Sequence, residues 1–259
     1  MLSSGPASPI PIRIRFAVLA LLVLCVSIRS DATPHLPPRL LSLPRLTVWA
    51  WERPEDLRRL DTQRVAVAYL DQTLTIALNV HSQPRRDPVI FPASATRIAV
   101  VRIETAPGAI LDGEARRQAI QYILSSATQP RLSALQIDFD ATRSQRDFYR
   151  ALLLDLRRQM PANLPLSITA LASWCSYDDW LRGLPIDEAV PMFFRMEPDR
   201  RRAAASISDF RMREPLCQSS IGISTGEAWP ENIDGKRIYL FPDHGWHTDS
   251  LITFERKLP

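Results

Sequence analysis

The sequence is poor in glycine, which accounts for only 8 of its 259 residues. Neither glycine-rich phosphate-binding motif, GxGxxG or GxxxxGK[ST], occurs in it. A nucleotide held by such a loop is therefore not expected, and no other cofactor is predicted. Lysine is also scarce, with 2 residues against 30 arginines, a bias that we attribute to genomic base composition.

A large excess of positive charge is missing as well. The first 30 residues hold three arginines and no acid, which leaves 29 basic and 28 acidic side chains in the rest of the chain. This balance does not favour a nucleic-acid-binding face. At 46% hydrophobic residues, the chain has enough apolar surface to build a folded core.

Long hydrophobic runs are limited to residues 16–28, a 13-residue stretch that follows Arg13 and Arg15. This is shorter than the about 20 residues that span a bilayer, but it is typical of a secretory signal peptide. Ser30 and Ala32 provide small residues for cleavage after Ala32. An uncleaved anchor and lipidation at Cys25 remain alternatives.

These features predict three parts. Residues 1–32 are a signal peptide or N-terminal anchor, the Pro-rich residues 33–44 are a tether, and residues 45–259 form the folded domain. The protein is expected to be exported to the periplasm or the extracellular space, with membrane contact only through its N-terminal segment.

Only two cysteines occur in the exported part, Cys175 and Cys217. In an oxidising compartment such a pair predicts a disulfide, with two buried thiols as the alternative. His244 and His247 lie close in sequence, but no third ligand accompanies them, so no metal site is predicted.

Strand-like apolar runs recur along the folded domain. They occupy residues 46–51, 64–70, 97–104, 132–140, 164–174, 188–196, 219–225 and 236–241. Several are nearly continuous apolar runs, which is typical of parallel strands covered on both faces.

Helical patterns separate most of these runs, at residues 53–60, 112–126, 144–160, 178–184 and 199–210. In residues 144–160, Ser144 and Asp147 resemble a capping box. Eight strands alternating with helices predict an α/β fold of the (β/α)8 TIM-like barrel type. Residues 71–96 have no helical period, so we expect an irregular or hairpin insertion in place of the second helix. A doubly wound open sheet is the competing fold.

Candidate catalytic residues lie at the end of the fourth run. Alternation along a strand places Gln136, Asp138 and Asp140 on one face. Two neighbouring carboxyl groups do not ionise together easily, so one serves as a proton donor beside a charged stabiliser, as glycosidic cleavage requires. The alternatives are a buried network with arginine, or a role for Asp140 in capping the next helix.

Further candidates lie at other strand ends. Arg102 and Glu104 share a face and are expected to contact the two aspartates or to form a salt bridge. Trp49, Trp51 and Trp174 are candidates for stacking on sugar rings, although a tryptophan equally fills a core. Arg195 is a candidate for holding an anionic group of a substrate.

The runs LQIDFDATRSQRDFY, LSITALASWCSYDDWL, GLPIDEAVPMFFRM and YLFPDHGW resemble an exported bacterial family known as domain of unknown function 3142, across roughly residues 45–246. The resemblance implies a barrel related to glycoside hydrolases and implies no established activity. A more distant similarity is to family-18 chitinases, which carry DxxDxDxE on the fourth strand.

Two alignments to that motif are possible. If Asp140 matches the terminal acid, Ser133 and Gln136 replace the two earlier aspartates. If Asp138 and Asp140 match the middle aspartates, the terminal position falls on Thr142, which cannot supply a proton. The first alignment describes an enzyme and the second an inactive barrel.

Three functions therefore remain open: a hydrolase of oligo- or polysaccharide, a non-catalytic glycan-binding barrel, and an envelope scaffold that binds another protein.

Overall fold

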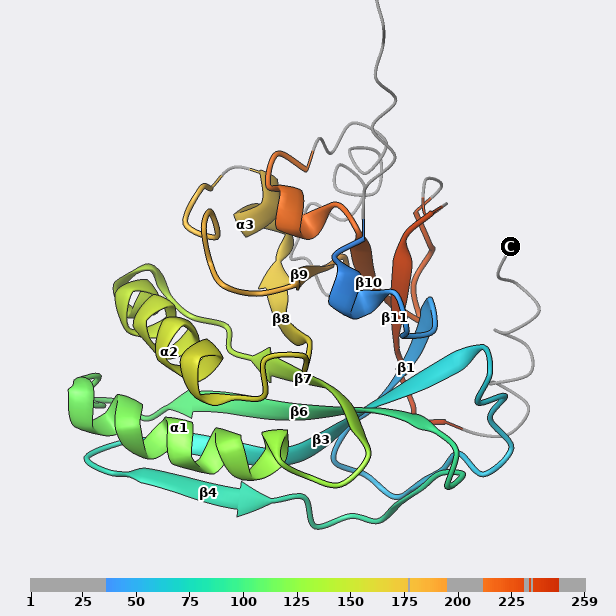
Figure 1. The fold of residues 1–259 in the computed structure, drawn as a ribbon, viewed down its shortest axis with the longest axis horizontal. Coiled ribbons are helices and arrows are strands. Elements are labelled where there is room, and N and C mark those ends of the chain that lie inside the picture. Colours follow the sequence, from blue (N-terminus) through green and yellow to red (C-terminus); the bar gives the residue numbers. More distant parts are fainter. Residues whose placement is uncertain (1–35, 177, 195–211, 231–232, 234, 247–259) are drawn as a thin grey trace, which may run out of the picture. The chain divides into compact units, whose positions relative to one another are not determined.

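The computed structural model describes residues 36–176, 178–194, 212–230, 233 and 235–246 (Figure 1). The predicted signal peptide with its cleavage site, Cys25, His247, Arg195 and the predicted helix 199–210 lie outside the described residues. No helix in the described part of the chain is long and apolar enough to cross a membrane.

Eight parallel strands of the described chain close into a barrel. They are β1 (Leu46–Ala50), β3 (Val65–Ile76), β6 (Thr96–Thr105), β7 (Leu132–Asp138), β8 (Leu166–Leu171), β9 (Glu188–Met192), β10 (Ser220–Ser224) and β11 (Arg237–Phe241). The order β1-β11-β10-β9-β8-β7-β6-β3 returns to β1, because β1 also pairs in parallel with β3. The predicted TIM-like barrel is confirmed, and an open doubly wound sheet is excluded.

Alternate side chains along each strand face the barrel interior or the outer layer. On β7, for example, Ala134 belongs to the interior apolar cluster, and Leu135 and Ile137 belong to the outer one. All eight strands correspond to apolar runs recognised in the sequence, because strands buried on both faces need apolar residues at nearly every position.

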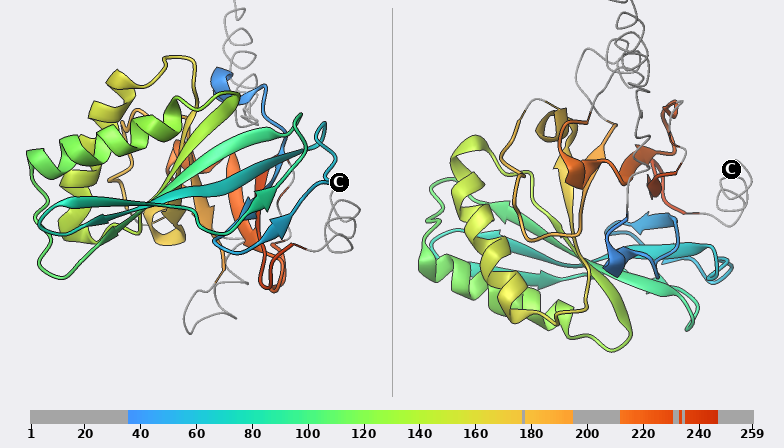
Figure 2. Two further views of the ribbon diagram at one scale, coloured as in Figure 1. Left: turned by 90° about the horizontal axis from the view of Figure 1, so that it is seen from below. Right: turned by 45° about the horizontal axis from the view of Figure 1, so that its top comes forward.

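Two long helices cover part of the barrel's outer surface. α1 (Gly113–Ala127) and α2 (Arg146–Gln159) lie side by side, and α1 contacts β3, β4, β6 and β7 (Figures 1 and 2). The Asp112 carboxylate caps α1 by accepting bonds from the backbone N–H groups of Glu114 and Ala115. Tyr149 and Leu152 are among the α2 side chains that are fully buried against the barrel.

The capping box of the second helical segment is built by Thr142 and Gln145, not by Ser144 and Asp147 as predicted. The Thr142 N–H donates to the Gln145 side chain at 2.8 Å. A short 3-10 helix (Arg143–Gln145) precedes α2, so the helical segment begins one residue earlier than the pattern indicated. Asp140 therefore does not cap this helix.

A hairpin replaces the second helix of the barrel, as predicted. β3 continues beyond the barrel and pairs antiparallel with β4 (Val80–Pro84). An irregularity in the β3–β6 register at Asp71 marks this transition. The Asp71 carboxylate accepts bonds from Ser126 and Gln129 at the end of α1, at 2.6 and 2.8 Å.

Two predicted helices are absent. Residues 53–60 contain the short strand β2 (Glu55–Asp56), which pairs with β5 (Val89–Ile90). In residues 178–184, a turn at residues 180–183 takes the place of the predicted helix and leads towards β9. The one additional helix in this region is α3 (Ala172–Ser176), which follows β8 directly. Both predicted helices were short. In such short segments, tertiary contacts determine the backbone conformation more strongly than helix propensity does.

The base of the barrel is closed by residues that the sequence assigned to a tether. Leu40 and Leu43 are buried in the interior cluster, next to a 3-10 helix (Pro38–Leu40). The Arg237 guanidinium donates to the carbonyl groups of Leu43 and Pro44 and also pairs with the buried Glu188 at 3.3 Å. The folded domain therefore starts before residue 45, because two leucines in the Pro-rich segment have an apolar site to fill.

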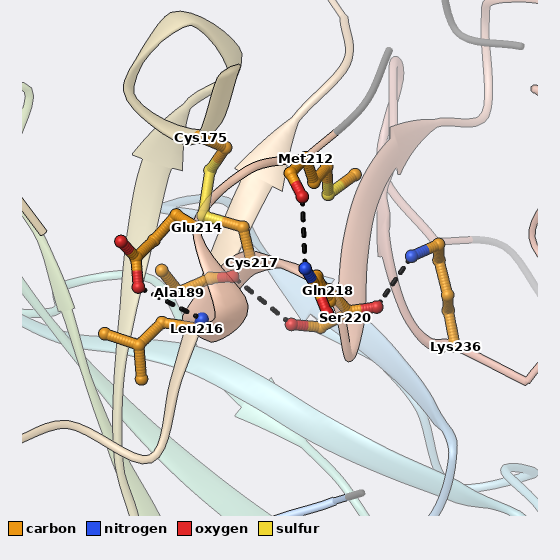
Figure 3. The surroundings of a disulfide bond; sticks show 9 residues. All are labelled: Cys175, Ala189, Met212, Glu214, Leu216, Cys217, Gln218, Ser220 and Lys236. Carbon is orange, nitrogen blue, oxygen red and sulfur yellow. Dashed lines mark hydrogen bonds between the residues drawn. A yellow bond between two sulfur atoms is a disulfide. The ribbon is translucent and has the colours of Figure 1, made fainter. Parts of the chain in front are cut away.

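The predicted disulfide between Cys175 and Cys217 is present (Figure 3). It joins α3 to a 3-10 helix (Pro215–Cys217) that lies just before β10. The Cys175 carbonyl also accepts bonds from the N–H groups of Arg213 and Glu214, at 3.0 and 3.3 Å. The bond thus fixes the segment leading into β10 against the segment that follows β8.

Replacing both cysteines by serine should lower the free energy of unfolding by about 4 kcal/mol, because the cross-link closes a loop of 42 residues. Urea unfolding of the wild type and the double variant, both without reductant, measures this difference. As a control, reductant should destabilise only the wild type. Two titratable thiols at these positions in the native protein, or equal stabilities, would contradict the prediction.

Candidate functional site

A cavity of about 720 Å3 opens at the carboxyl ends of the barrel strands. This is the end at which TIM-barrel enzymes carry their active sites. Its lining residues come from seven of the eight strands or from the segments that follow them: Trp49, Trp51, Arg53, Arg102, Asp138, Asp140, Leu171, Ala172, Ser173, Met192, Phe194, Ser224, Phe241, Pro242 and Asp243.

Asp138 is the most firmly held acid in the cavity. It is the last residue of β7, faces the interior and is 3% exposed. One carboxylate oxygen accepts a bond from an Arg102 Nη atom at 2.8 Å, and the other accepts a bond from the Thr169 hydroxyl at 2.6 Å. Arg102 lies on β6 and Thr169 on β8, so the two strands next to β7 fix the orientation of this carboxylate.

Asp140 lies two residues further along and also lines the cavity, but its environment differs. Among the described residues, none forms a hydrogen bond or an ion pair with its carboxylate. Desolvation by the surrounding protein raises the pKa of Asp140 above its ordinary value, and the negative charge of Asp138 raises it further. Arg102 lowers the same pKa, but by less. Asp140 is therefore suited to carry a proton beside a charged Asp138.

Arg102 connects this pair to a second acid and to an aromatic ring. Its Nε atom donates to Glu104 at 2.8 Å, and its guanidinium carbon lies 5.2 Å from the centre of the Trp51 ring. Burial lowers the pKa of Arg102, but Asp138 and Glu104 together raise it by more, so this guanidinium remains charged.

Aromatic rings form one wall of the cavity. Trp49 and Trp51 are stacked, with ring centres 4.8 Å apart, and Phe241 packs on Trp49 at the same distance. Phe194 continues the wall, 4.7 Å from Phe241. Flat apolar faces of this kind are suited to the C–H faces of sugar rings.

The structure brings some of the predicted residues together and separates others. Trp49, Trp51, Arg102, Asp138 and Asp140 line one cavity. Gln136 lies beneath it and is fully buried. The Gln136 amide accepts a bond from Trp49 Nε1 at 2.9 Å and donates to Ser167 at 3.1 Å.

Glu104 and Trp174 are not among the lining residues. Glu104 is exposed and contacts the cavity only through its ion pair with Arg102. Trp174 lies in α3 and packs edge-on against Trp180, at 4.8 Å between ring centres. It is 2% exposed and belongs to the outer core, because the chain leaves β8 three residues before it.

Sequence reasoning missed several lining residues, among them Arg53, Phe194 and Asp243. Asp243 follows β11 after Phe241 and Pro242. Its N–H donates to the Thr225 hydroxyl at 3.0 Å, and its carboxylate packs against Gly226, where a Cβ atom would come within 2.7 Å of it. The sequence could have indicated these residues by their position alone, because each of them follows the end of a strand.

Metal binding finds no support in the described residues, because no group of three His, Cys, Asp or Glu side chains among them is placed to hold an ion. Thr142, the alternative match to the terminal acid of the chitinase motif, is the helix-capping residue described above. Asp138 at the end of β7 and Asp140 after it are the carboxyl groups that the cavity offers here.

A comparison with known protein families gives a match to the part of the chain that carries the two aspartates. Residues 94–190 match the family described as domain of unknown function (DUF3142). The matched segment runs from β6 to the start of β9 and thus includes Arg102, Asp138 and Asp140.

Among solved structures, the chain is similar to the chitinase domain of the spore coat protein CotE from Clostridium difficile. The two are 12% identical, the TM-score is 0.44, and the match covers 76% of this chain and 67% of that one. No curated protein sequence matches this chain.

The charges around Asp140 make the direction of its pKa change in variants predictable. Asp138→Asn should lower the pKa of Asp140, because it removes the negative charge that raises it. Arg102→Gln should raise that pKa, because it removes the positive charge that lowers it. The carboxyl carbon shift of Asp140, followed by NMR against pH, reports both changes.

Glu104→Gln is the matched control for this titration. It removes a carboxylate from the same arginine, but Glu104 is not among the groups that shift the pKa of Asp140. Its effect should therefore be smaller than that of Asp138→Asn. Shifts of the wrong sign in both site variants would refute the electrostatic description of the pair.

Proposed function

We propose that the cavity binds an oligo- or polysaccharide and that the protein is a glycoside hydrolase acting outside the cytoplasm. The observation that carries this proposal is the pair at the end of β7: an unpartnered carboxyl group with a raised pKa, beside a carboxylate held by Arg102 and Thr169. The family assigns no activity, so the proposal rests on this geometry.

The two aspartates support different roles. Asp140 would donate its proton to the glycosidic oxygen, so that the bond to the leaving sugar breaks. Positive charge then develops on the sugar ring, where the negative charge of Asp138 would stabilise it. A water molecule would attack the anomeric carbon and return a proton to Asp140, which completes hydrolysis. Arg102 and Thr169 each donate one hydrogen bond to Asp138, so they hold this carboxylate in place for such a role.

Binding would use the aromatic wall. A cavity of about 720 Å3 is in the range of ligand-binding sites, and its surface is largely apolar with a few polar groups. Trp51 and Phe241 are half-buried rings in the cavity lining, where a sugar could pack against their exposed parts. Asp138 and Asp140 line the same cavity, where they could interact with the hydroxyl groups and the glycosidic oxygen of a sugar packed on this wall.

Export is supported by the disulfide, since such bonds persist in oxidising compartments. Cleavage after Ala32, anchoring and lipidation at Cys25 stay predictions from the sequence.

A non-catalytic glycan-binding barrel is the second candidate. One observation favours it: Asp138, the acid nearest to Asp140 along β7, already has both oxygens occupied. In that case the cavity would retain sugars by stacking and hydrogen bonding without cleaving them.

Turnover of a panel of fluorogenic glycosides and natural oligosaccharides by the wild type and by Asp140→Asn tests the catalytic proposal. Loss of the proton donor should lower kcat by about 10^2 to 10^4-fold, because general acid catalysis contributes on this scale. Asp56→Asn is the control, because Asp56 is exposed and pairs only with Arg58 outside the cavity.

An Asp140→Asn variant as active as the wild type would remove Asp140 from the mechanism. A wild type that binds oligosaccharides and cleaves none would establish the binding barrel instead. Failure of every glycan to bind would leave the scaffold that binds another protein.

A further inference from the structure

Acidic groups outnumber basic groups among the described residues that line the cavity. Three of its lining residues are carboxylic acids, Asp138, Asp140 and Asp243, and two are arginines, Arg53 and Arg102. Residues 31–259 carry 29 basic and 28 acidic side chains, so the described lining of the cavity is more acidic than this part of the chain as a whole.

Both arginines are already engaged by carboxylates. Arg102 is shared between Asp138 and Glu104, each at 2.8 Å. The Arg53 guanidinium lies 3.9 Å from the carboxylate of Glu55, which is itself buried. Both guanidinium groups therefore have carboxylates of their own, and among the described residues neither forms an ion pair with Asp243.

Asp140 and Asp243 are the two lining acids that form no ion pair with an arginine among the described residues. Asp140 has no partner among the described residues, and Asp243 contacts the exposed imidazole of His244 at 3.1 Å, which is positive only when protonated. β7 and β11 are four positions apart in a closed ring of eight strands. The two carboxyl groups thus lie on opposite sides of the same cavity.

The aromatic wall between them also favours positive charge. The face of an aromatic ring attracts cations when they lie within about 6 Å of its centre. The Trp51 ring already holds the Arg102 guanidinium at 5.2 Å in this way. Phe241 and Phe194 continue the wall from β11 and from the end of β9, and both line the cavity.

We infer that the cavity selects glycans bearing free, protonated amino groups, as in chains of glucosamine, over N-acetylated or acidic chains. The inference rests on the proposed function, since it names the substrate class of the same cavity. An ammonium group would pair with Asp243 while its sugar ring stacks on the aromatic wall. An N-acetyl group brings no charge to these acids, and a uronic acid would be repelled by them.

Binding of matched tetrasaccharides to the full-length protein tests the inference. Glucosamine and N-acetylglucosamine tetramers differ in the amino substituent, and oligogalacturonate supplies an acidic chain. Tryptophan fluorescence, recorded within seconds of mixing at mildly acidic pH and low salt, reports binding because Trp51 lines the cavity. The glucosamine tetramer should bind about tenfold more tightly than the acetylated one, and about 0.5 M NaCl should shrink this preference.

Asp243→Asn should reduce the preference for the amino sugar by about two- to fivefold, as expected for a half-exposed charge pair. Glu114→Gln is the matched control, because it removes an exposed acid that pairs with Arg117 outside the cavity. If Asp243→Asn fails to fold, the salt dependence of wild-type binding and the comparison of the three tetrasaccharides still test the inference.

Equal or tighter binding of the acetylated or the acidic tetramer would overturn the inference and leave the proposed glycan site intact. A preference unchanged by salt and by Asp243→Asn would overturn its electrostatic basis. If no tetrasaccharide binds, the proposed function itself fails, and the inference fails with it.

Discussion

Closure of the sheet between β1 and β3 is the constraint on which the other features depend. β1 is only five residues long, yet it pairs with β11 on one side and with β3 on the other. Only in a closed barrel do inward-facing residues of distant strands meet, as Trp49 of β1 and Gln136 of β7 do. The same closure places the ends of β7 and β11 on opposite sides of one cavity.

Two chains of hydrogen bonds connect polar side chains in the interior below the cavity, although the buried Thr47 hydroxyl and Arg237 Nη2 have no hydrogen-bond partner among the described residues. Trp49, Gln136 and Ser167 form one chain of hydrogen bonds, and Arg102, Asp138 and Thr169 form another. Buried polar groups are costly unless they are paired, so this degree of pairing holds the strands in one arrangement. Asp140 stands out because it adjoins this network and takes no part in it.

The barrel could be predicted from the sequence because its strands are unusually easy to recognise. Strands buried on both faces appear as apolar runs, and residues 71–96 lacked a helical period because they form β3, its continuation and the hairpin strand β4. The pair Cys175 and Cys217 predicted the disulfide by number alone. By contrast, the short segments 53–60 and 178–184 gave helical patterns that tertiary contacts override.

The site was predictable along a strand and not between strands. Alternation in β7 placed Asp138 and Asp140 on one face. The location of Trp174 outside the cavity could not be predicted without knowing that β8 ends at Leu171. Phe194 and Asp243 join the cavity through the ring order of the strands, which no local pattern contains. Leu40 and Leu43 were assigned to a tether, because a Pro-rich composition does not reveal that the barrel base has room for two leucines.

The replacement of a helix by a hairpin has a consequence for self-association. A closed barrel exposes no unpaired strand, but β4 lies outside the ring and forms the outer edge of the nine-stranded sheet. Backbone pairing between two copies through this sheet is therefore restricted to residues 80–84. Pro84 ends that edge without an N–H group, and its neighbours His81 and Gln83 are exposed and polar, so the strand offers little to an incoming β-segment.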